Sequence, residues 1–206
     1  MKNKQFFKGK KFTLGLFLAV YLILLSPTNA LGAGLAPAGG ILFSPTSFFS
    51  GVDIKIYAIV FNNTYDTMYA TVNFYDGDVF VASKKAENII KEEARQISAP
   101  WKALFGEHTF KVILSDIKVA KNGELVPINA SELGSEAEVQ YNKFIDDDTD
   151  KDGVGDRQDE DDDNDGLTDA QEESYGSNKN LQDTDADGLS DSVEASQGTD
   201  LVLKDS

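Results

Sequence analysis

The sequence contains no cysteine and only one histidine, His108, among its 206 residues. The absence of cysteine excludes disulfide bonds, thiolate metal sites, a cysteine nucleophile and a lipid attached to an N-terminal cysteine. A single histidine leaves no basis for a multi-histidine zinc site or a histidine-dependent catalytic constellation. Bases are scarce too, since 19 Lys and Arg against 35 Asp and Glu give a net charge of −16, and this argues against a nucleic-acid partner. We therefore predict a protein that is not an enzyme and has no catalytic residues.

The charges that are present divide the chain into segments. The first 33 residues hold five lysines and no acid, whereas residues 146–206 hold 22 acids and four bases. From this distribution and the patterns described below we predict four parts. They are a signal peptide over 1–32, a β-sandwich domain over 33–128, a linker over 129–145 and acidic repeats over 146–206.

The N-terminal segment has the order of a secretory signal. Five lysines precede a 14-residue apolar run, Phe12–Leu25, which is shorter than the roughly 20 residues needed to span a bilayer. Small residues follow, and we predict cleavage after Ala30 or Gly32. The alternative is an uncleaved N-terminal anchor. Both predict a location outside the cytoplasm, either secreted or at the cell surface or envelope.

Residues 41–128 alternate apolar and polar side chains in short runs. Val52, Ile54, Ile56, Ala58 and Val60 share one face of a predicted strand, and Met68–Phe74 repeats the pattern. Asp76-Gly77 and Asn122-Gly123 are typical of tight hairpin turns, and further runs cover 96–101, 109–114, 117–119 and 124–128. This pattern predicts an all-β sandwich of about seven short strands. The stretch 86–95 fits either a short helix or a charged strand.

Three pieces of this region carry a family resemblance: IYAIVFNNT, VNFYDGDVF and ISAPWKALFGEHTFKVIL. Their order resembles bacterial immunoglobulin-like domains of the cell-adhesion-related (CARDB) type over about 80 residues. The resemblance implies an Ig-like sandwich. Trp101 could stack on a sugar, but we predict a core position for it. We interpret His108 as a turn residue because no serine or second histidine accompanies it.

The acidic segment contains three copies of D-x-D-x-D-G-x-x-D-x-x-[DE], which begin at Asp148, Asp161 and Asp183. Calcium takes 6–8 oxygens at about 2.3–2.6 Å, so alternate residues can surround one ion where a glycine at position 6 turns the backbone sharply. Positions 1, 3, 5, 9 and 12 would supply carboxylates and position 7 a carbonyl oxygen. The predicted ligands are Asp148, Asp150, Asp152, Val154, Asp156 and Asp159; Asp161, Asp163, Asp165, Leu167, Asp169 and Glu172; and Asp183, Asp185, Asp187, Leu189, Asp191 and Glu194.

Two details refine this prediction. Asp159 is shorter than Glu172 and Glu194, so the first loop is expected to bind more weakly or to share ligands with the second. Residues 163–184 and 185–206 align without gaps at a period of 22, with 10 identities. The chain stops at the opening residues of what would be another loop, which predicts a truncated sequence whose later loops and any membrane anchor are missing.

The loop pattern resembles thrombospondin type 3 repeats in their bacterial form. DTDADGLSDSVE is followed by Gly198-Thr199-Asp200, and Gly176-Ser177-Asn178 is the corresponding turn of the preceding repeat. The resemblance covers 146–206. It implies Ca²⁺ as the ion, little regular secondary structure and a fold organised by metal. Because long flanking helices are lacking, a calmodulin-like switch is disfavoured, and Mg²⁺ fits such oxygen-rich loops less well.

These observations predict a secreted or surface-displayed structural protein in which calcium stiffens a stalk that carries an Ig-like domain. The expected partners are calcium and an unidentified extracellular protein or glycan, with membrane contact only through the signal segment or a missing C-terminal anchor. The alternative is a carbohydrate-binding or accessory module of an extracellular polysaccharide-degrading enzyme.

Overall fold

The computed structural model describes residues 32–36 and 40–204. The predicted signal peptide over 1–32, with its cleavage site, therefore lies outside the described residues except for Gly32. Within the described part of the chain, no helix has the length and apolar character needed to cross a membrane.

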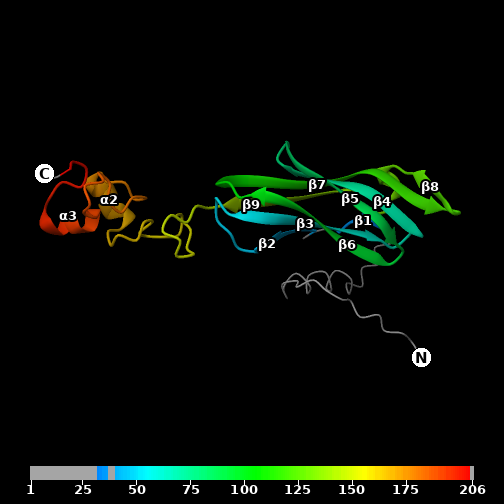
Figure 1. Cartoon of the computed structure of the whole chain (residues 1–206), viewed down its shortest axis with the longest axis horizontal. Coiled ribbons are helices and arrows are strands. Elements are labelled where there is room, and N and C mark those ends of the chain that lie inside the picture. Colours follow the sequence, from blue (N-terminus) through cyan, green and yellow to red (C-terminus); the bar gives the residue numbers. More distant parts are fainter. Residues whose placement is uncertain (1–31, 37–39, 205–206) are drawn as a thin grey trace, which may run out of the picture. The chain divides into compact units, whose positions relative to one another are not determined.

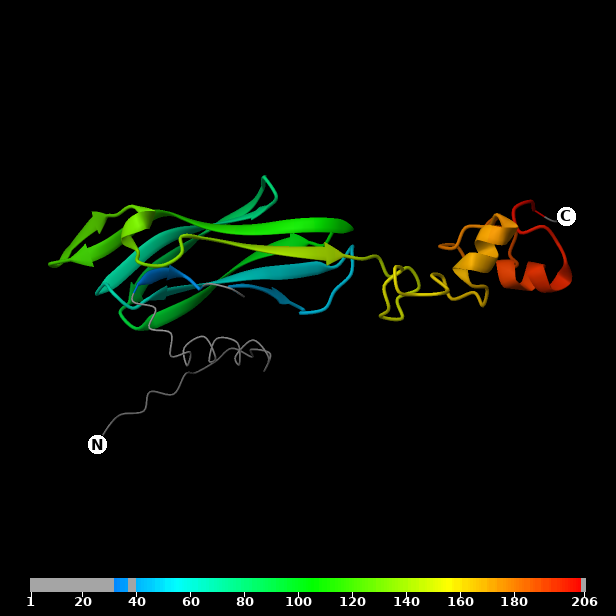
Figure 2. The ribbon, with the colours of Figure 1, turned by 180° about the vertical axis from the view of Figure 1, so that it is seen from behind.

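The described residues form nine strands in two antiparallel sheets, which lie as two layers in Figures 1 and 2. One sheet has the order β1-β3-β2, with β6 also pairing with β3, and the other has the order β5-β4-β7-β8, with β9 also pairing with β7. This arrangement confirms the predicted all-β sandwich. The strands are β1 (Ala33–Leu35), β2 (Ile41–Ser44), β3 (Asp53–Asn62), β4 (Thr67–Asp76), β5 (Val79–Ile90), β6 (Glu93–Lys102), β7 (Gly106–Lys121), β8 (Glu124–Pro127) and β9 (Glu138–Ile145).

The apolar face of β4 follows the predicted alternation. Met68, Ala70, Val72 and Phe74 are buried, while Tyr69, Thr71 and Asn73 between them are half-buried. Val72 and Phe74 stand opposite Leu114 and Val112 of β7. Apolar side chains on alternate positions thus build the core, as a strand with one face against a second sheet requires. In β3 the expected face is buried from Ile54 onward, whereas Val52 precedes the strand and is exposed.

The two predicted hairpins are present. Asp76 pairs with Val79 across one turn, and Lys121 pairs with Glu124 across the Asn122-Gly123 turn, where both residues have positive φ. The stretch left open between helix and strand, 86–95, is the end of β5, a turn at Lys91-Glu92 and the start of β6. The separate runs 109–114 and 117–119 belong to one long strand, β7, and Asp116 within it has a φ of 49°.

The Trp101 side chain does not lie in the core, so that prediction is wrong. Trp101 is half-buried, and its ring meets the His108 ring edge to face at a centroid distance of 5.0 Å. His108 lies in strand β7, so the prediction of a turn residue is wrong, and its Nε2 lies 2.9 Å from the Leu104 carbonyl oxygen.

Residues 129–145 contain the short 3-10 helix η1 (Ala130–Glu132) and strand β9. Leu133 and Ile145 are almost fully buried. The C-terminal part of the predicted linker is thus a strand of the sandwich, because Glu138–Ile145 pairs with β7.

The described chain divides into two compact units. The first contains the residues up to Leu42 together with Ile56–Ala99 and Phe110–Tyr141, and the second contains Phe43–Lys55, Pro100–Thr109 and the chain from Asn142 onward. The second unit thus joins several strand ends to the acidic loops. Within it, the Ser50 amide donates to the Asp146 carbonyl at 2.8 Å, and the Arg157 guanidinium lies 4.3 Å from the ring centroid of Phe144.

Candidate metal centre

The backbone of the three acidic loops follows one pattern. Gly153, Gly166 and Gly188 at position 6 have φ between 97° and 105°, a conformation that only glycine adopts without strain. The position 4 residues Lys151, Asn164 and Ala186 are also left-handed, with φ of 58–68°. Two left-handed residues in three positions fold each loop back on itself, which brings alternate side chains toward one point.

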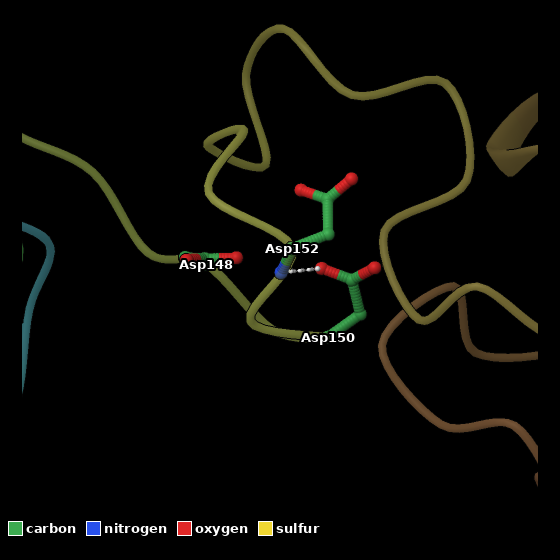
Figure 3. Close-up of side chains that lie close together, drawn as sticks. All are labelled: Asp148, Asp150 and Asp152. Carbon is green, nitrogen blue, oxygen red and sulfur yellow. Dashed lines mark hydrogen bonds between the residues drawn. The ribbon is translucent and has the colours of Figure 1, made fainter.

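Three aspartates from each loop converge at that point. Carboxylate oxygens from positions 1, 3 and 5 lie within 4.8 Å of one another in each loop. Figure 3 shows the first of these groups, Asp148, Asp150 and Asp152, with the Asp152 amide donating to the Asp150 carboxylate at 3.0 Å. The corresponding amide bonds of the other loops are Asp165 to Asp163 at 3.1 Å and Asp187 to Asp185 at 3.0 Å. One oxygen of each position 3 carboxylate therefore holds the turn.

The second oxygens fit a bound cation. In the second loop, Asp161 Oδ1, Asp163 Oδ2 and both oxygens of Glu172 are buried and have no hydrogen-bond donor. Asp163 is 3% exposed and Glu172 is fully buried. Buried carboxylates without donors are costly unless a positive charge compensates them. Asp161, Asp163 and Asp165 thus form a cluster of carboxylates that could hold a metal ion.

The raised pKa values of carboxylates in these loops also favour a bound cation. Burial raises the pKa of Asp163 to about 6, and the charges of Asp165, Asp161 and Asp191 add to the rise. Burial and then Asp163, Asp165, Asp191 and Asp169 raise the pKa of Glu172 to about 7. Burial similarly raises the pKa of Asp185 in the third loop. Each of these carboxylates is surrounded by other carboxylates of the loops, so a divalent cation would bind by displacing protons.

The position 9 aspartates have a defined place in the structure. Each accepts the position 2 amide of its own loop: Thr149 to Asp156 at 2.9 Å, Asp162 to Asp169 at 3.1 Å and Thr184 to Asp191 at 2.9 Å. These carboxylates therefore tie the two ends of the loop together. Their predicted part as ligands, directly or through water, stays a prediction.

Position 12 differs between the loops. Glu172 lies on helix α2 (Asp169–Tyr175) and Glu194 on helix α3 (Asp191–Gln197), and both are fully buried. Asp159 lies on no helix and accepts the Asp161 amide at 3.1 Å. The first loop is thus built differently at its C-terminal end, where the sequence predicts weaker binding or shared ligands. At position 7, Leu167 is buried, whereas Val154 and Leu189 are exposed.

The two short helices were not predicted, although their signals are present in the sequence. Thr168 and Ser190 at position 8 are N-caps whose side chains accept the amides of Gln171 and Val193. Left-handed glycines, Gly176 and Gly198, end the helices. A threonine followed three residues later by glutamine, then a glycine beyond the turn, is a known helix signature.

Other residues that contact the second loop were missed because they occupy none of the fixed positions of the repeated motif. Lys179 Nζ contacts Asp162 Oδ2 at 2.6 Å and Asp169 Oδ2 at 2.7 Å. Ser192 and Gln182 donate to Asp165 and Asp163. Their partners are distant in sequence, so spacing alone gives no signal for them.

Comparison with known proteins identifies the repeats. Residues 161–178 and 183–200 match the family model of the bacterial TSP3 repeat. This confirms the predicted resemblance for the second and third loops, and the first loop lies outside the matched segments. The repeats also have little regular secondary structure, as predicted. No curated protein matches the chain.

Among solved structures, the chain is similar to the CARDB domain of a protein from Pyrococcus furiosus, crystallised in complex with di-metal ions. The similarity covers 55% of this chain and 89% of that chain at 8% sequence identity and a TM-score of 0.36.

Proposed function

We propose that this chain is an exported, non-enzymatic structural protein whose acidic loops bind Ca²⁺ and thereby stiffen a spacer that carries an Ig-like sandwich. The observation that carries the proposal is the second loop, in which buried carboxylate oxygens of Asp161, Asp163 and Glu172 surround one turn without donors. The match of this loop and the third to the bacterial TSP3 repeat supports calcium as the ion. Export rests on the lysine-rich start and apolar run of the N-terminal segment.

Calcium would act by reversing an unfavourable charge balance. Residues 146–206 carry 22 acids and four bases, and Leu167 and Leu201 are their only apolar residues that are almost fully buried within the described part of this segment. Extracellular calcium modules have dissociation constants of about 10⁻⁴–10⁻³ M. At millimolar calcium each loop would then gain on the order of 1–2 kcal/mol by mass action. Three loops together would keep the segment compact, whereas mutual repulsion extends it without metal.

We infer that the sandwich is the part that meets a partner, and that the whole acts in adhesion or surface architecture. One observation favours the alternative of a carbohydrate-binding module. A groove of about 570 Å³ lies on the β5-β4-β7-β8 sheet, lined by Tyr69, Thr71, Glu87, Asp116 and Lys118 among others. Glycan-array binding by the full chain, lost on Tyr69→Ala, would support the module. Adhesion without glycan affinity supports the structural function.

Isothermal titration with CaCl₂ tests the ligand assignment. Asp163→Asn, Asp185→Asn, Glu172→Gln and Glu194→Gln each remove charge at nearly constant size, and we expect about a tenfold or greater loss of affinity at the altered loop, since charge-bearing ligands set calcium affinity. Glu160→Gln and Glu173→Gln are the matched controls, because both side chains are exposed and lie outside the ligand pattern. Equal losses in both groups would indicate diffuse counterion attraction and overturn the proposal.

A further inference from the structure

Each acidic loop is closed at its base by one backbone hydrogen bond. The position 9 amide donates to the carbonyl of the residue that precedes position 1: Asp156 to Asp147 at 3.1 Å, Asp169 to Glu160 at 2.9 Å and Asp191 to Gln182 at 2.9 Å. We call these pairs the necks of the loops. The neck of the third loop thus consists of Gln182 and Asp191, and Ser192 follows it directly.

The neck of the third loop also contacts the second loop. The Ser192 amide donates to Asp165 Oδ2 and its hydroxyl to the Asp165 carbonyl, both at 2.7 Å. The Gln182 side-chain amide donates to the Asp163 carbonyl. Asp163 and Asp165 are positions 3 and 5 of the second loop, so both acceptor residues are predicted calcium ligands. We call Gln182 and Ser192 the clasp.

Comparison of the two 22-residue repeats shows that the clasp is specific to the third loop. The residues 22 positions earlier are Glu160 and Ala170. An ionised glutamate has no side-chain donor and alanine has no polar side-chain atom. These two residues therefore cannot make the equivalent side-chain hydrogen bonds to the first loop. The clasp is therefore a feature of this pair of loops and does not follow from the repeated motif.

Buried charge links the same two loops. Asp191, in the neck of the third loop, is fully buried, as is Glu172 of the second loop. Buried carboxylates are costly unless a cation compensates them, so both loops that meet at the clasp are stabilised by a bound cation.

We propose that Gln182 and Ser192 are positioning residues for the second loop, and that closure of the third loop around calcium sets them in place. This inference rests on the proposed function, in which both loops bind calcium. Closing the neck brings Gln182 and Ser192 together through the hydrogen bond from the Asp191 amide to the Gln182 carbonyl. From there the Gln182 side-chain amide and the Ser192 amide and hydroxyl orient Asp163 and Asp165. Calcium in the third loop then raises the calcium affinity of the second, and linkage requires the reverse effect to be equally large.

The experiment uses the full exported chain and CaCl₂, with the amide signals of Gly166 and Gly188 in nitrogen–proton correlation spectra as separate reporters. Each glycine amide donates to position 1 of its own loop, Gly166 to Asp161 at 3.1 Å and Gly188 to Asp183 at 2.9 Å. The third loop is disabled by Asp185→Asn with Glu194→Gln. We expect this change to raise the calcium midpoint of Gly166 about tenfold.

The clasp variant, Gln182→Met with Ser192→Ala, tests how the loops communicate. This variant removes the Gln182 and Ser192 side-chain donors but keeps the Ser192 backbone amide. Disabling the third loop in this background should therefore shift the Gly166 midpoint by no more than about threefold, since a removed interaction contributes no coupling. The matched control is Ser196→Ala with Gln197→Met in the same helix, because the Ser196 hydroxyl donates only to the Val193 carbonyl at 2.7 Å. The control should keep the tenfold shift.

A tenfold shift that persists in the clasp variant overturns the proposal, as does a shift that is absent from the unaltered protein. Failure of the proposed function looks different. In that case neither glycine signal would respond to CaCl₂ beyond its response to NaCl of equal ionic strength.

Discussion

Position 2 of each loop determines how the position 9 carboxylate is held. In the first and third loops this residue is threonine, and the hydroxyls of Thr149 and Thr184 donate to Asp156 and Asp191 at 2.8 and 2.7 Å. In the second loop it is Asp162, whose ionised side chain cannot donate. The Lys179 ammonium replaces the hydroxyl by contacting the carboxylates of Asp162 and Asp169 together. A lysine from the next turn thus compensates for an acid inside the loop.

This substitution pattern gives a prediction at the level of one residue. Lys179→Met leaves the Asp162 and Asp169 carboxylates facing each other, with the Asp162 side chain fully buried. Because Lys179 itself is half exposed, we expect the second loop to lose about 1–2 kcal/mol of stability, less than the loss for a fully buried pair. The measurement is hydrogen exchange of the residue 162 amide, which donates to Asp169 Oδ1 at 3.1 Å. Protection should fall about tenfold.

Adding Asp162→Thr to Lys179→Met should restore protection, since threonine performs this task in the other two loops. Lys151→Met, at an exposed lysine of the first loop, is the control and should leave the amide unchanged. A double variant no better protected than Lys179→Met alone would show that the lysine does not replace a hydroxyl.

At the level of elements, each loop has a left-handed turn, and the loops differ in whether a helix follows that turn. Helices follow the second and third loops because Thr168 and Ser190 cap them. The first loop has Gly155 at that position, where a Cβ atom would come within 2.8 Å of Asp146 Oδ2. Glycine has no side chain with which to cap a helix, and Asp159 is not carried on a helix as Glu172 and Glu194 are.

Replacing alanine by glycine should have opposite effects in the turn of the third loop and in helix α2. Ala186 is an exposed alanine with a φ of 61°, and Ala186→Gly should stabilise the closed third loop by about 0.5–1 kcal/mol because the left-handed conformation is strained for alanine. Ala170→Gly, at an exposed position of α2, should destabilise that helix by about 1 kcal/mol. The calcium concentration at the midpoint of the Gly188 signal should therefore fall, and the corresponding concentration for the Gly166 signal should rise. A change of the same sign in both would contradict the assigned turn geometry.

For the molecule as a whole, two sources of stability act in different places. In the sandwich, apolar side chains such as Phe74, Phe110 and Ile56 are fully buried between the sheets. In the repeats, the fully buried side chains include the carboxylates of Glu172 and Glu194. Apolar burial stabilises without metal, whereas buried carboxylates need a compensating cation. The two parts should therefore differ in their response to a chelator.

We expect the strand signal in far-ultraviolet circular dichroism to survive calcium removal, while protease sensitivity within 146–206 rises sharply. Phe74→Ala is the matched perturbation of the sandwich. It should cost about 3–5 kcal/mol, with or without calcium, because it leaves a cavity in the core. Loss of the strand signal in chelator alone would mean that the sandwich, too, depends on metal.

The sequence by itself determined the parts that depend on local pattern. Alternation predicted the sandwich, because a strand exposes its two faces to different surroundings at every second residue. Spacing predicted the three aspartate clusters, because a loop that closes around one point needs oxygens on alternate residues and glycine at the turn. In both cases the interacting residues are neighbours in the chain or obey one period.

Only the tertiary structure decided which residues join the loops to one another and which surface aromatic residues stay outside the core. Trp101 is placed by the ends of two strands, and Lys179, Gln182 and Ser192 reach acceptors 10 to 27 residues away. These contacts depend on where the chain folds back in space. A single donor placed by that fold leaves no periodic trace in the sequence, since one hydrogen bond needs only one suitable side chain at one position.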